Sequence, residues 1–263
     1  MTKSDVIAVG SVAADTLDKL HFEQAVYTVT EQSMLAPQLM KMRLCGPTAA
    51  ISAPGQFVNI ALPGFFLRRP ISICDWDEQG LTIIYKIVGE GTRYMAALTS
   101  GAQLDVLCGL GNGFDTSCSG ERPLLVGGGA GVPPMYGLAK ALLQQGQQPI
   151  ALLGFNRAEE IYLAEDFHAL GVETIITTMD GSCGVRGVVT DALPADYSYF
   201  YACGPIPMLK ALAEAAATEG QLSFEERMGC GFGACMGCTC TTKYGYKRIC
   251  REGPVLKKEE VIW

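Results

Sequence analysis

Long apolar runs, basic residues and histidines are all scarce in this 263-residue sequence. Its 20 lysines and arginines are outnumbered by 27 aspartates and glutamates, which gives a formal net charge of -7 at pH 7. Nucleic-acid binding usually needs a concentrated basic face, so this balance argues against a nucleic-acid partner. No uninterrupted apolar run reaches the roughly 18 residues of a membrane span, and the N-terminal segment carries aspartates where a signal peptide would be apolar. We therefore expect a soluble, cytoplasmic protein that binds no membrane.

Histidine, the commonest general acid or base in enzymes, occurs only as His21 and His168. Neither lies in a motif-like setting. No cysteine, serine or lysine stands out as a base that would take a proton from a substrate. The sequence therefore predicts no catalytic acid or base in this chain.

Cysteine, by contrast, occurs 11 times. Cytosolic thiols are held reduced, so a disulfide framework is not expected. Scattered cytosolic cysteines are usually small buried hydrophobic residues. We interpret six of the cysteines in this way, namely Cys45, Cys74, Cys108, Cys118, Cys183 and Cys203.

The remaining five cysteines lie close together near the C-terminus. The spacing Cys230-x4-Cys235-x2-Cys238, with a more distant Cys250, matches the four thiolates that hold a [2Fe-2S] cluster in plant-type ferredoxins. Glycines separate these ligands, and glycine lets a backbone wrap closely around a cluster and donate hydrogen bonds to its sulfurs. We predict Cys230, Cys235, Cys238 and Cys250 as the ligands and leave Cys240 out.

Zinc is the alternative occupant, because it also takes four cysteines. Zinc sites usually pair their ligands as two short Cys-x2-4-Cys units, whereas here three ligands share one loop and the fourth stands apart. The spacing favours the iron-sulfur cluster.

The chain divides into three regions by its pattern of apolar runs. Residues 1–120 alternate short apolar runs with Pro and Gly clusters, which is typical of an antiparallel barrel or sandwich; the residues before Phe22 form a first strand or an extended arm. Residues 121–220 alternate strands with helices, including helix-like segments at 132–146 and 157–171, which predicts an α/β unit with a parallel sheet. Residues 221–263 are rich in Cys and Gly and too short for an apolar core of their own.

Two strands of the first region carry polar groups suited to a flat ligand. Arg69 and Ser72 flank a proline that fixes the local backbone, although an edge strand with a solvated arginine explains the same residues. A second strand leads to Gly91 and Thr92 at the start of the only predicted helix of this region, an arrangement that suits a pyrophosphate. Together the two strands are suited to frame a flavin.

The second region has a glycine-rich turn directly after its first strand. Gly128 and Gly129 lie where a dinucleotide pyrophosphate approaches backbone amides, although the Gly-x-Gly-x-x-Gly register is not met. Cys203 begins a Cys-Gly-Pro sequence at the end of a later strand, which is also typical of a buried thiol followed by a turn.

Taken together, Arg-Pro-x-Ser, Gly-Gly-Gly-x-Gly and Cys-Gly-Pro resemble the ferredoxin-NADP reductase superfamily over nearly the whole chain. The C-terminal sequence CGFGACMGCTC, with its fourth cysteine before REGPV, narrows the resemblance to the electron-transfer subunits of NAD-dependent dihydroorotate dehydrogenase. The resemblance implies an antiparallel FAD-binding barrel, a parallel-sheet NAD-binding unit and a small [2Fe-2S] loop domain.

The resemblance also implies roles for individual residues. Cys230, Cys235, Cys238 and Cys250 would ligate iron, while Gly128, Gly129 and Cys203 are the candidates for binding the nicotinamide nucleotide. The residues implied at FAD are Arg69, Pro70, Ile71, Ser72, Ile84, Tyr85, Lys86, Gly91 and Thr92.

The implied partner is a catalytic subunit that holds FMN and oxidises dihydroorotate, assembled with this chain as a heterotetramer of two unlike pairs. An exposed apolar patch around Met228, Phe232 and Met236 would lie under that partner, or these side chains would pack against the barrel. Two other interpretations remain open: the small flavin and [2Fe-2S] subunit of a ferredoxin-NADP oxidoreductase or sulfide dehydrogenase, and a zinc-holding redox-sensing module.

Overall fold

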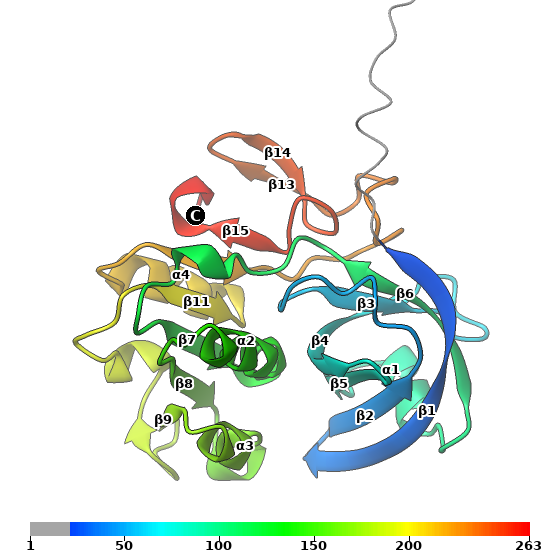
Figure 1. Cartoon of the computed structure of the whole chain (residues 1–263), viewed down its shortest axis with the longest axis horizontal. Helices are drawn as coiled ribbons and strands as arrows, with labels where there is room; N and C mark the ends of the chain where they lie inside the picture. The colour runs from blue at the N-terminus through cyan, green and yellow to red at the C-terminus, as the bar shows by residue number, and fades with distance from the viewer. Residues whose placement is uncertain (1–21) are drawn as a thin grey trace, which may run out of the picture.

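A computed structural model describes residues 22–263, so the strand or arm predicted before Phe22 lies outside the described residues. The N-terminal half is a closed antiparallel barrel with one helix, α1 (Glu90–Ala96), at its side (Figure 1). The barrel strands, in spatial order, are β1 (Glu23–Ala36), β2 (Leu39–Cys45), β5 (Gly80–Lys86), β4 (Arg69–Asp77), β3 (Phe57–Ile60) and β6 (Gln103–Leu110).

Alternation of side chains along the strands fills the barrel. In β3, Val58 and Ile60 are fully buried inside it, whereas Phe57 points out and packs with side chains of the C-terminal segment. The outer face of β3 therefore contacts the part of the chain that carries the clustered cysteines.

The second unit is a seven-stranded sheet whose strands run parallel except for the last. Helix α2 (Val132–Gln144) packs between this sheet and the barrel, and α4 (Ile206–Ala215) covers the other face (Figure 1). In order across the sheet, the strands are β10 (Val185–Arg186), β9 (Glu173–Thr178), β8 (Ile150–Phe155), β7 (Leu124–Gly128), β11 (Phe200–Cys203), β12 (Gly220–Ser223) and β15 (Val255–Lys257).

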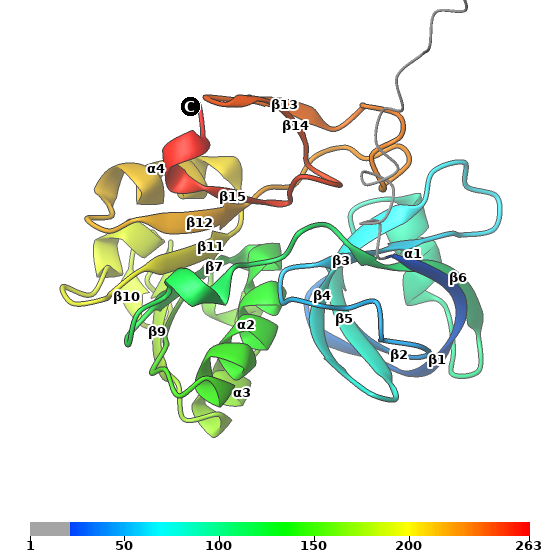
Figure 2. The same ribbon diagram turned by 45° about the horizontal axis from the view of Figure 1, so that its top comes forward.

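The C-terminal segment leaves the sheet after β12 and returns to it as β15. Between these strands lie the cysteine-rich stretch and a hairpin, β13 (Thr239–Thr242) and β14 (Gly245–Arg248), on the same side of the molecule (Figure 2). We call residues 224–254 the cluster lobe. The predicted combination of an antiparallel barrel, a parallel-sheet unit and a C-terminal cysteine-rich segment is confirmed.

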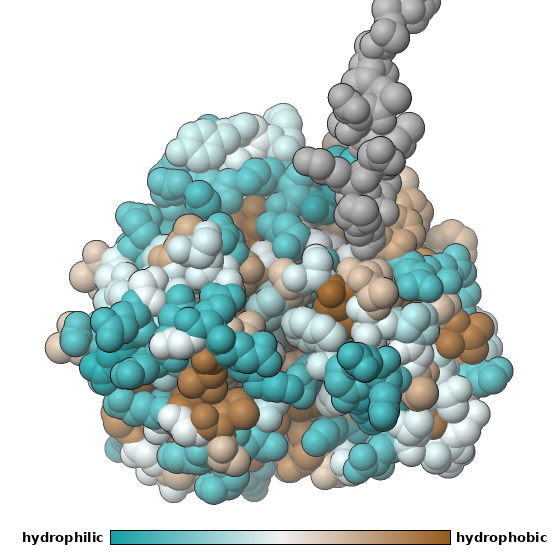
Figure 3. All heavy atoms as spheres, viewed as in Figure 1, coloured by the Kyte–Doolittle hydropathy of each residue, from teal (hydrophilic) through white to brown (hydrophobic). Residues whose placement is uncertain are grey.

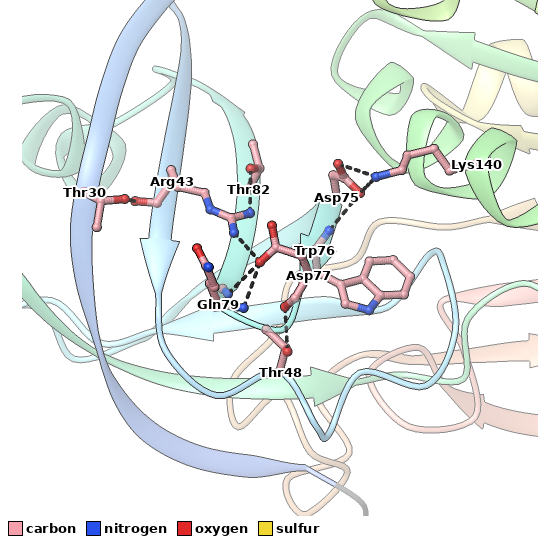
Figure 4. A network of polar contacts seen from close by, with 10 residues as sticks. Thr30, Arg43, Thr48, Asp75, Trp76, Asp77, Gln79, Thr82 and Lys140 are labelled. Carbon is pink, nitrogen blue, oxygen red and sulfur yellow. Dashed lines mark hydrogen bonds and ion pairs between the residues drawn. The ribbon is translucent and has the colours of Figure 1, made fainter. Parts of the chain in front are cut away.

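The barrel and the sheet unit meet through α2. Lys140 of α2 forms an ion pair with Asp75 of β4, with Nζ 2.6 Å from Oδ1, and Figure 4 shows the lysine reaching from the helix toward this strand. Nearby, a Cβ added to Gly137 would lie 2.7 Å from the carbonyl oxygen of Cys74, so the helix approaches the barrel at van der Waals distance. The two units therefore form one packed body.

The predicted helix at 157–171 is only partly correct. The structure has a 3-10 turn at Ala158–Glu160 and a short α3 (Ala164–Ala169), separated by Leu163 in the left-handed region at φ 61°. The break accompanies the burial of Tyr162, whose hydroxyl donates to the Gly129 carbonyl oxygen at 2.7 Å. Further 3-10 turns lie at Thr116–Cys118, Gly129–Gly131, Val189–Ala192 and Lys258–Glu260.

Between residues 22 and 263, no helix is both long and apolar enough to cross a bilayer. On the face drawn in Figure 3, apolar side chains lie in separate groups among hydrophilic ones.

Candidate functional site

A cavity of about 310 Å³ opens between the barrel and the cluster lobe. Neighbouring strands β4 and β5 and the first turn of α1 form its barrel wall, and Met228 and Pro254 belong to the opposite wall. Of the residues predicted at FAD, the cavity is lined by Arg69, Pro70, Ile71, Ser72, Tyr85, Lys86 and Thr92.

Two residues predicted at FAD lie behind this lining. Ile84 alternates with Tyr85 on β5 and is buried in the apolar core that contains α2. Gly91 lies against the Arg69 side chain: a Cβ added there would be 2.1 Å from Nε of Arg69. The absence of a side chain at residue 91 thus makes room for the guanidinium, which also lies 4.8 Å from the centre of the Phe65 ring.

Thr92 organises the turn that enters α1. Its hydroxyl oxygen accepts hydrogen bonds from the backbone N–H groups of Val88 at 2.9 Å and Gly89 at 3.2 Å. The hydroxyl of Thr92 thus fixes the turn at residues 88–92. Arg69 and Lys86 supply positive charge on the same cavity wall. A cationic cavity wall next to a fixed turn fits the diphosphate of a flavin dinucleotide.

A second cavity, of about 360 Å³, lies at the carboxyl ends of β7, β8 and β9, the edge where α/β sheets bind their ligands. Gly128 and Gly129 line it, together with Asn156, Thr177 and Met208 from neighbouring segments. A Cβ added to Gly128 would lie 2.4 Å from Sδ of Met208, so a side chain at residue 128 would displace the Met208 thioether from its present position. The lining is predominantly apolar, which suits a nicotinamide or adenine ring.

Cys203 lines neither cavity. Its thiol is buried beneath the carboxyl end of β11, and this burial, together with the Glu225 carboxylate, raises its pKa to about 12. The carbonyl group of Cys203 packs against Gly131, where an added Cβ would lie 2.1 Å away. The backbone of Cys203, rather than its thiol, therefore packs against the glycine-rich turn.

The sequence analysis missed Glu225 and Ser223, which line the 310 Å³ cavity from the end of β12. Desolvation raises the pKa of the Glu225 carboxyl group, although part of the residue is exposed to solvent. No motif surrounds these residues, so only their position on the same cavity as Arg69–Ser72 identifies them as candidate site residues.

The two cavities lie on either side of one turn. Gly129 lines the cavity at the sheet edge, and the next residue, Ala130, lines the cavity of the barrel. Ligands that fill the two cavities would therefore be neighbours.

The four predicted cluster ligands lie in two pairs. Sγ of Cys235 accepts a hydrogen bond from the Cys230 N–H at 3.4 Å, and Sγ of Cys238 accepts one from the Cys250 N–H, also at 3.4 Å. Within residues 22–263, no three His, Cys, Asp or Glu side chains converge as a single metal ion would need. Two pairs of thiols are the donor set with which proteins hold a cluster of two irons.

Backbone N–H groups favour ionisation of the Cys230 thiol. Burial of the Cys230 thiol opposes its deprotonation, but hydrogen bonds from nearby backbone N–H groups, among them that of Ala234 at 3.2 Å, outweigh burial and lower the pKa to about 6. A thiolate is the form that binds iron. Cys240 lies on β13 opposite Lys247 and takes part in neither pair.

Arg248, the last residue of β14, bonds to the loop that carries Cys230 and Cys235. Its Nη1 donates to the Gly233 carbonyl oxygen at 2.6 Å, and its backbone N–H and Nε donate to Oε2 of Glu252 at 2.8 and 2.9 Å. One cation thus joins the stretch between Cys230 and Cys235 to the turn that follows Cys250.

Of the three apolar side chains predicted to pack against the barrel or to form an exposed patch, two are packed and one is exposed. Met228 and Phe232 pack against the apolar core outside the barrel, and the Phe232 ring stacks on Phe22 with centroids 5.6 Å apart. Met236 is 55% exposed, next to the exposed Cys235. The outer surface of the loop is thus at Cys235 and Met236.

Two family models match the chain in the regions just described. "Iron-sulfur cluster binding domain of dihydroorotate dehydrogenase B" matches residues 225–262, and "Oxidoreductase NAD-binding domain" matches residues 125–214. A protein named dihydroorotate dehydrogenase B (NAD(+)), electron transfer subunit, from Fusobacterium nucleatum is 44% identical over 251 residues, which is 89% of this chain and 96% of that protein. The chain belongs to this family of electron-transfer subunits.

Another member of the family and a solved structure of a different oxidoreductase are also similar to this chain. The electron-transfer subunit of dihydroorotate dehydrogenase B from Bacillus caldolyticus is 43% identical, over 89% of this chain and 97% of its own length. A chain of the NADH-dependent reduced ferredoxin-NADP oxidoreductase is 28% identical and superposes with a TM-score of 0.83, over 91% of this chain and 90% of its own. The predicted family, the iron-sulfur domain and the NAD-binding domain are confirmed, and the chain is an oxidoreductase subunit that works with a catalytic partner.

Proposed function

We propose that the chain carries electrons from the FMN of a dihydroorotate-oxidising subunit through a [2Fe-2S] cluster and FAD to NAD⁺, as a step of pyrimidine synthesis. When bound, the flavin would convert between the single electrons of an iron-sulfur cluster and the hydride of a nicotinamide. The residues of this chain would hold the three groups, and the flavin residues would lie between the cluster residues and the nucleotide residues.

The observation that carries the proposal is the continuity of the three sites. Met228, two residues before Cys230, belongs to the wall of the 310 Å³ cavity, and Ala130 on the same cavity adjoins Gly129 of the nucleotide cavity. An electron path from the cysteine loop to the sheet edge therefore passes through the cavity that the predicted flavin residues line.

The assignment of residues follows this series. Cys230 and Cys235 are proposed to hold one iron, and Cys238 and Cys250 the other. The glycine-rich turn at Gly128 and Gly129 would hold NAD, supported by Cys203. FAD would be held by Arg69, Pro70, Ile71, Ser72, Tyr85, Lys86 and Thr92, with Gly91 and Ile84 supporting them from behind.

The remaining parts of the proposal concern the setting of the chain. We propose domains at 1–120 for FAD, 121–220 for NAD and 221–263 for the cluster, a heterotetramer of two unlike pairs, and a cytoplasmic location. The exposed side of the loop, at Cys235 and Met236, is where the catalytic partner would approach.

The test is anaerobic purification of the chain together with its catalytic partner, followed by iron, sulfide and flavin analysis and titration with NADH. We expect FAD, FMN and two irons with two labile sulfides per pair of unlike chains, and bleaching of both flavin and cluster absorption by NADH. A colourless protein with zinc would establish the redox-sensing module instead. A partner that holds a [4Fe-4S] cluster would establish the small subunit of another reductase, the alternative with which the solved structure at a TM-score of 0.83 is consistent.

A further inference from the structure

Asn59 is a buried polar residue on the wall between the barrel and the cluster lobe. It lies in β3 directly opposite Pro70, which is one of the predicted FAD residues on β4. The side chain of Asn59 is on the outer face of β3. The residue is only 1% exposed. A buried amide is costly unless it is hydrogen-bonded, and an apolar residue would fill the same space without that cost.

The side chain of Asn59 is bonded to a predicted iron ligand. Its Nδ2 donates to the carbonyl oxygen of Cys230 at 3.3 Å. Within residues 22–263, this is the one hydrogen bond that joins the six barrel strands to the cysteine loop at 228–240. Besides apolar packing, the barrel strands therefore hold this loop through the Asn59 side chain.

The loop is shaped to admit this amide. Gly231 has φ +82°, and a Cβ added to it would lie 2.2 Å from Nδ2 of Asn59. The residue after the first ligand is thus a glycine for two reasons, its backbone conformation and the space that Asn59 occupies. On the other side of the loop, Arg248 holds the Gly233 carbonyl oxygen.

Half of the amide has no partner. Oδ1 of Asn59 is buried and accepts no hydrogen bond within the described residues. Native proteins rarely leave such a group unpaired without a functional reason. The donor at Nδ2, rather than general packing, therefore explains why an asparagine stands at this position.

We propose that Asn59 is a positioning residue for electron transfer: it fixes the Cys230–Gly231 peptide against β3, the neighbour of the cavity-lining strand β4, and so sets the placement and electronic environment of the iron proposed at Cys230 and Cys235. This inference rests on the proposed function. Outer-shell partners of metal ligands act in this way, by orienting the ligand and adjusting its donor strength.

The test compares the full chain in complex with its catalytic subunit, as wild type and as Asn59→Leu, which keeps the size of the side chain and removes the donor. NADH is mixed with each complex in a stopped-flow instrument, and flavin and cluster absorption are followed separately. We expect reduction of FAD by NADH to stay within about twofold, and the later reduction of the cluster to slow roughly tenfold, the effect typical of a lost outer-shell bond. The spin-resonance spectrum and midpoint potential of the cluster should shift as well.

Gln221→Met is the matched control. Gln221 is also a buried amide, with hydrogen bonds to Asp115 and Tyr199, but it lines neither the 310 Å³ nor the 360 Å³ cavity, and its side-chain hydrogen bonds within residues 22–263 involve no cysteine. Its loss should lower stability and leave the cluster spectrum and transfer rate unchanged. If Asn59→Leu does not fold, Asn59→Ser, which is smaller and cannot span the same gap, repeats the measurement.

The outcomes separate the two proposals. A wild-type complex whose cluster is not reduced by NADH overturns the proposed function. A normal wild-type complex, with an Asn59 variant that matches wild type in cluster spectrum, potential and rate, overturns the role of Asn59 alone.

Discussion

Replacing Gly91 by alanine is expected to weaken FAD binding while sparing the fold. The new Cβ would lie 2.1 Å from Nε and 2.6 Å from Nη2 of Arg69, whereas real Cβ contacts essentially never fall below 3.0 Å. Nε must therefore retreat by at least 0.9 Å. The guanidinium is at the end of a flexible side chain, so it can move without the backbone.

The magnitude follows from the interaction that this movement breaks. A hydrogen bond from a charged donor contributes about 1.5–3 kcal/mol, so FAD affinity should fall roughly 10- to 150-fold. The free energy of unfolding of the FAD-free chain should not fall, because alanine exceeds glycine in helix propensity by about 1 kcal/mol. We expect weaker FAD binding without a loss of stability.

The assay is calorimetric titration of FAD into the FAD-free chain, beside urea unfolding of the same sample. Gly89→Ala is the control two residues away: a Cβ there meets nothing within 4 Å, and the residue has an extended φ of −165°. A Gly91→Ala protein that binds FAD as tightly as the Gly89→Ala protein would refute the placement of Arg69 at the flavin.

Two further predictions concern the cysteine loop and the barrel. Cys235→Ser should lose iron, labile sulfide and the cluster spin signal while FAD remains bound, and Cys240→Ser should keep all of them; a normal cluster in Cys235→Ser would contradict the ligand assignment. The hydrogen bond from Arg68 holds the pKa of Asp105 below its ordinary value of 3.8. Because the folded-state pKa is depressed, this pair stabilises the fold above pH 3.8 and loses its effect as pH falls through the lower folded value. Asp105→Asn should therefore be less stable than wild type at pH 7, by less than about 1 kcal/mol because the pair is partly exposed. Urea unfolding should show that this difference in stability shrinks at pH 3. A difference that stays constant between pH 7 and pH 3 would contradict the role of the Arg68–Asp105 pair.

The sequence predicts the architecture well because its signals are local. Apolar alternation marks the barrel strands, and the spacing of Cys230, Cys235 and Cys238 lies within one loop. The break at Leu163 was not predicted, because the burial of Tyr162 beside the glycine-rich turn is a tertiary contact that overrides helical periodicity.

The parts of the site that the sequence did not reveal come from distant segments. Glu225 follows β12 and reaches the 310 Å³ cavity only because that strand lies beside β11 in the sheet. Asn59 looks like a polar interruption of an apolar strand, and its partner is 171 residues away. Neither residue stands in a motif, so their roles depend on long-range packing that spacing does not encode.

The way the cluster lobe is attached has a consequence for how electrons move. Its two ends enter neighbouring strands of one sheet, since Leu222 of β12 pairs with Leu256 of β15. A module on a single flexible linker can swing between donor and acceptor. The cluster lobe has instead both of its ends in adjacent strands, so we expect it to hold its place against the barrel while electrons pass.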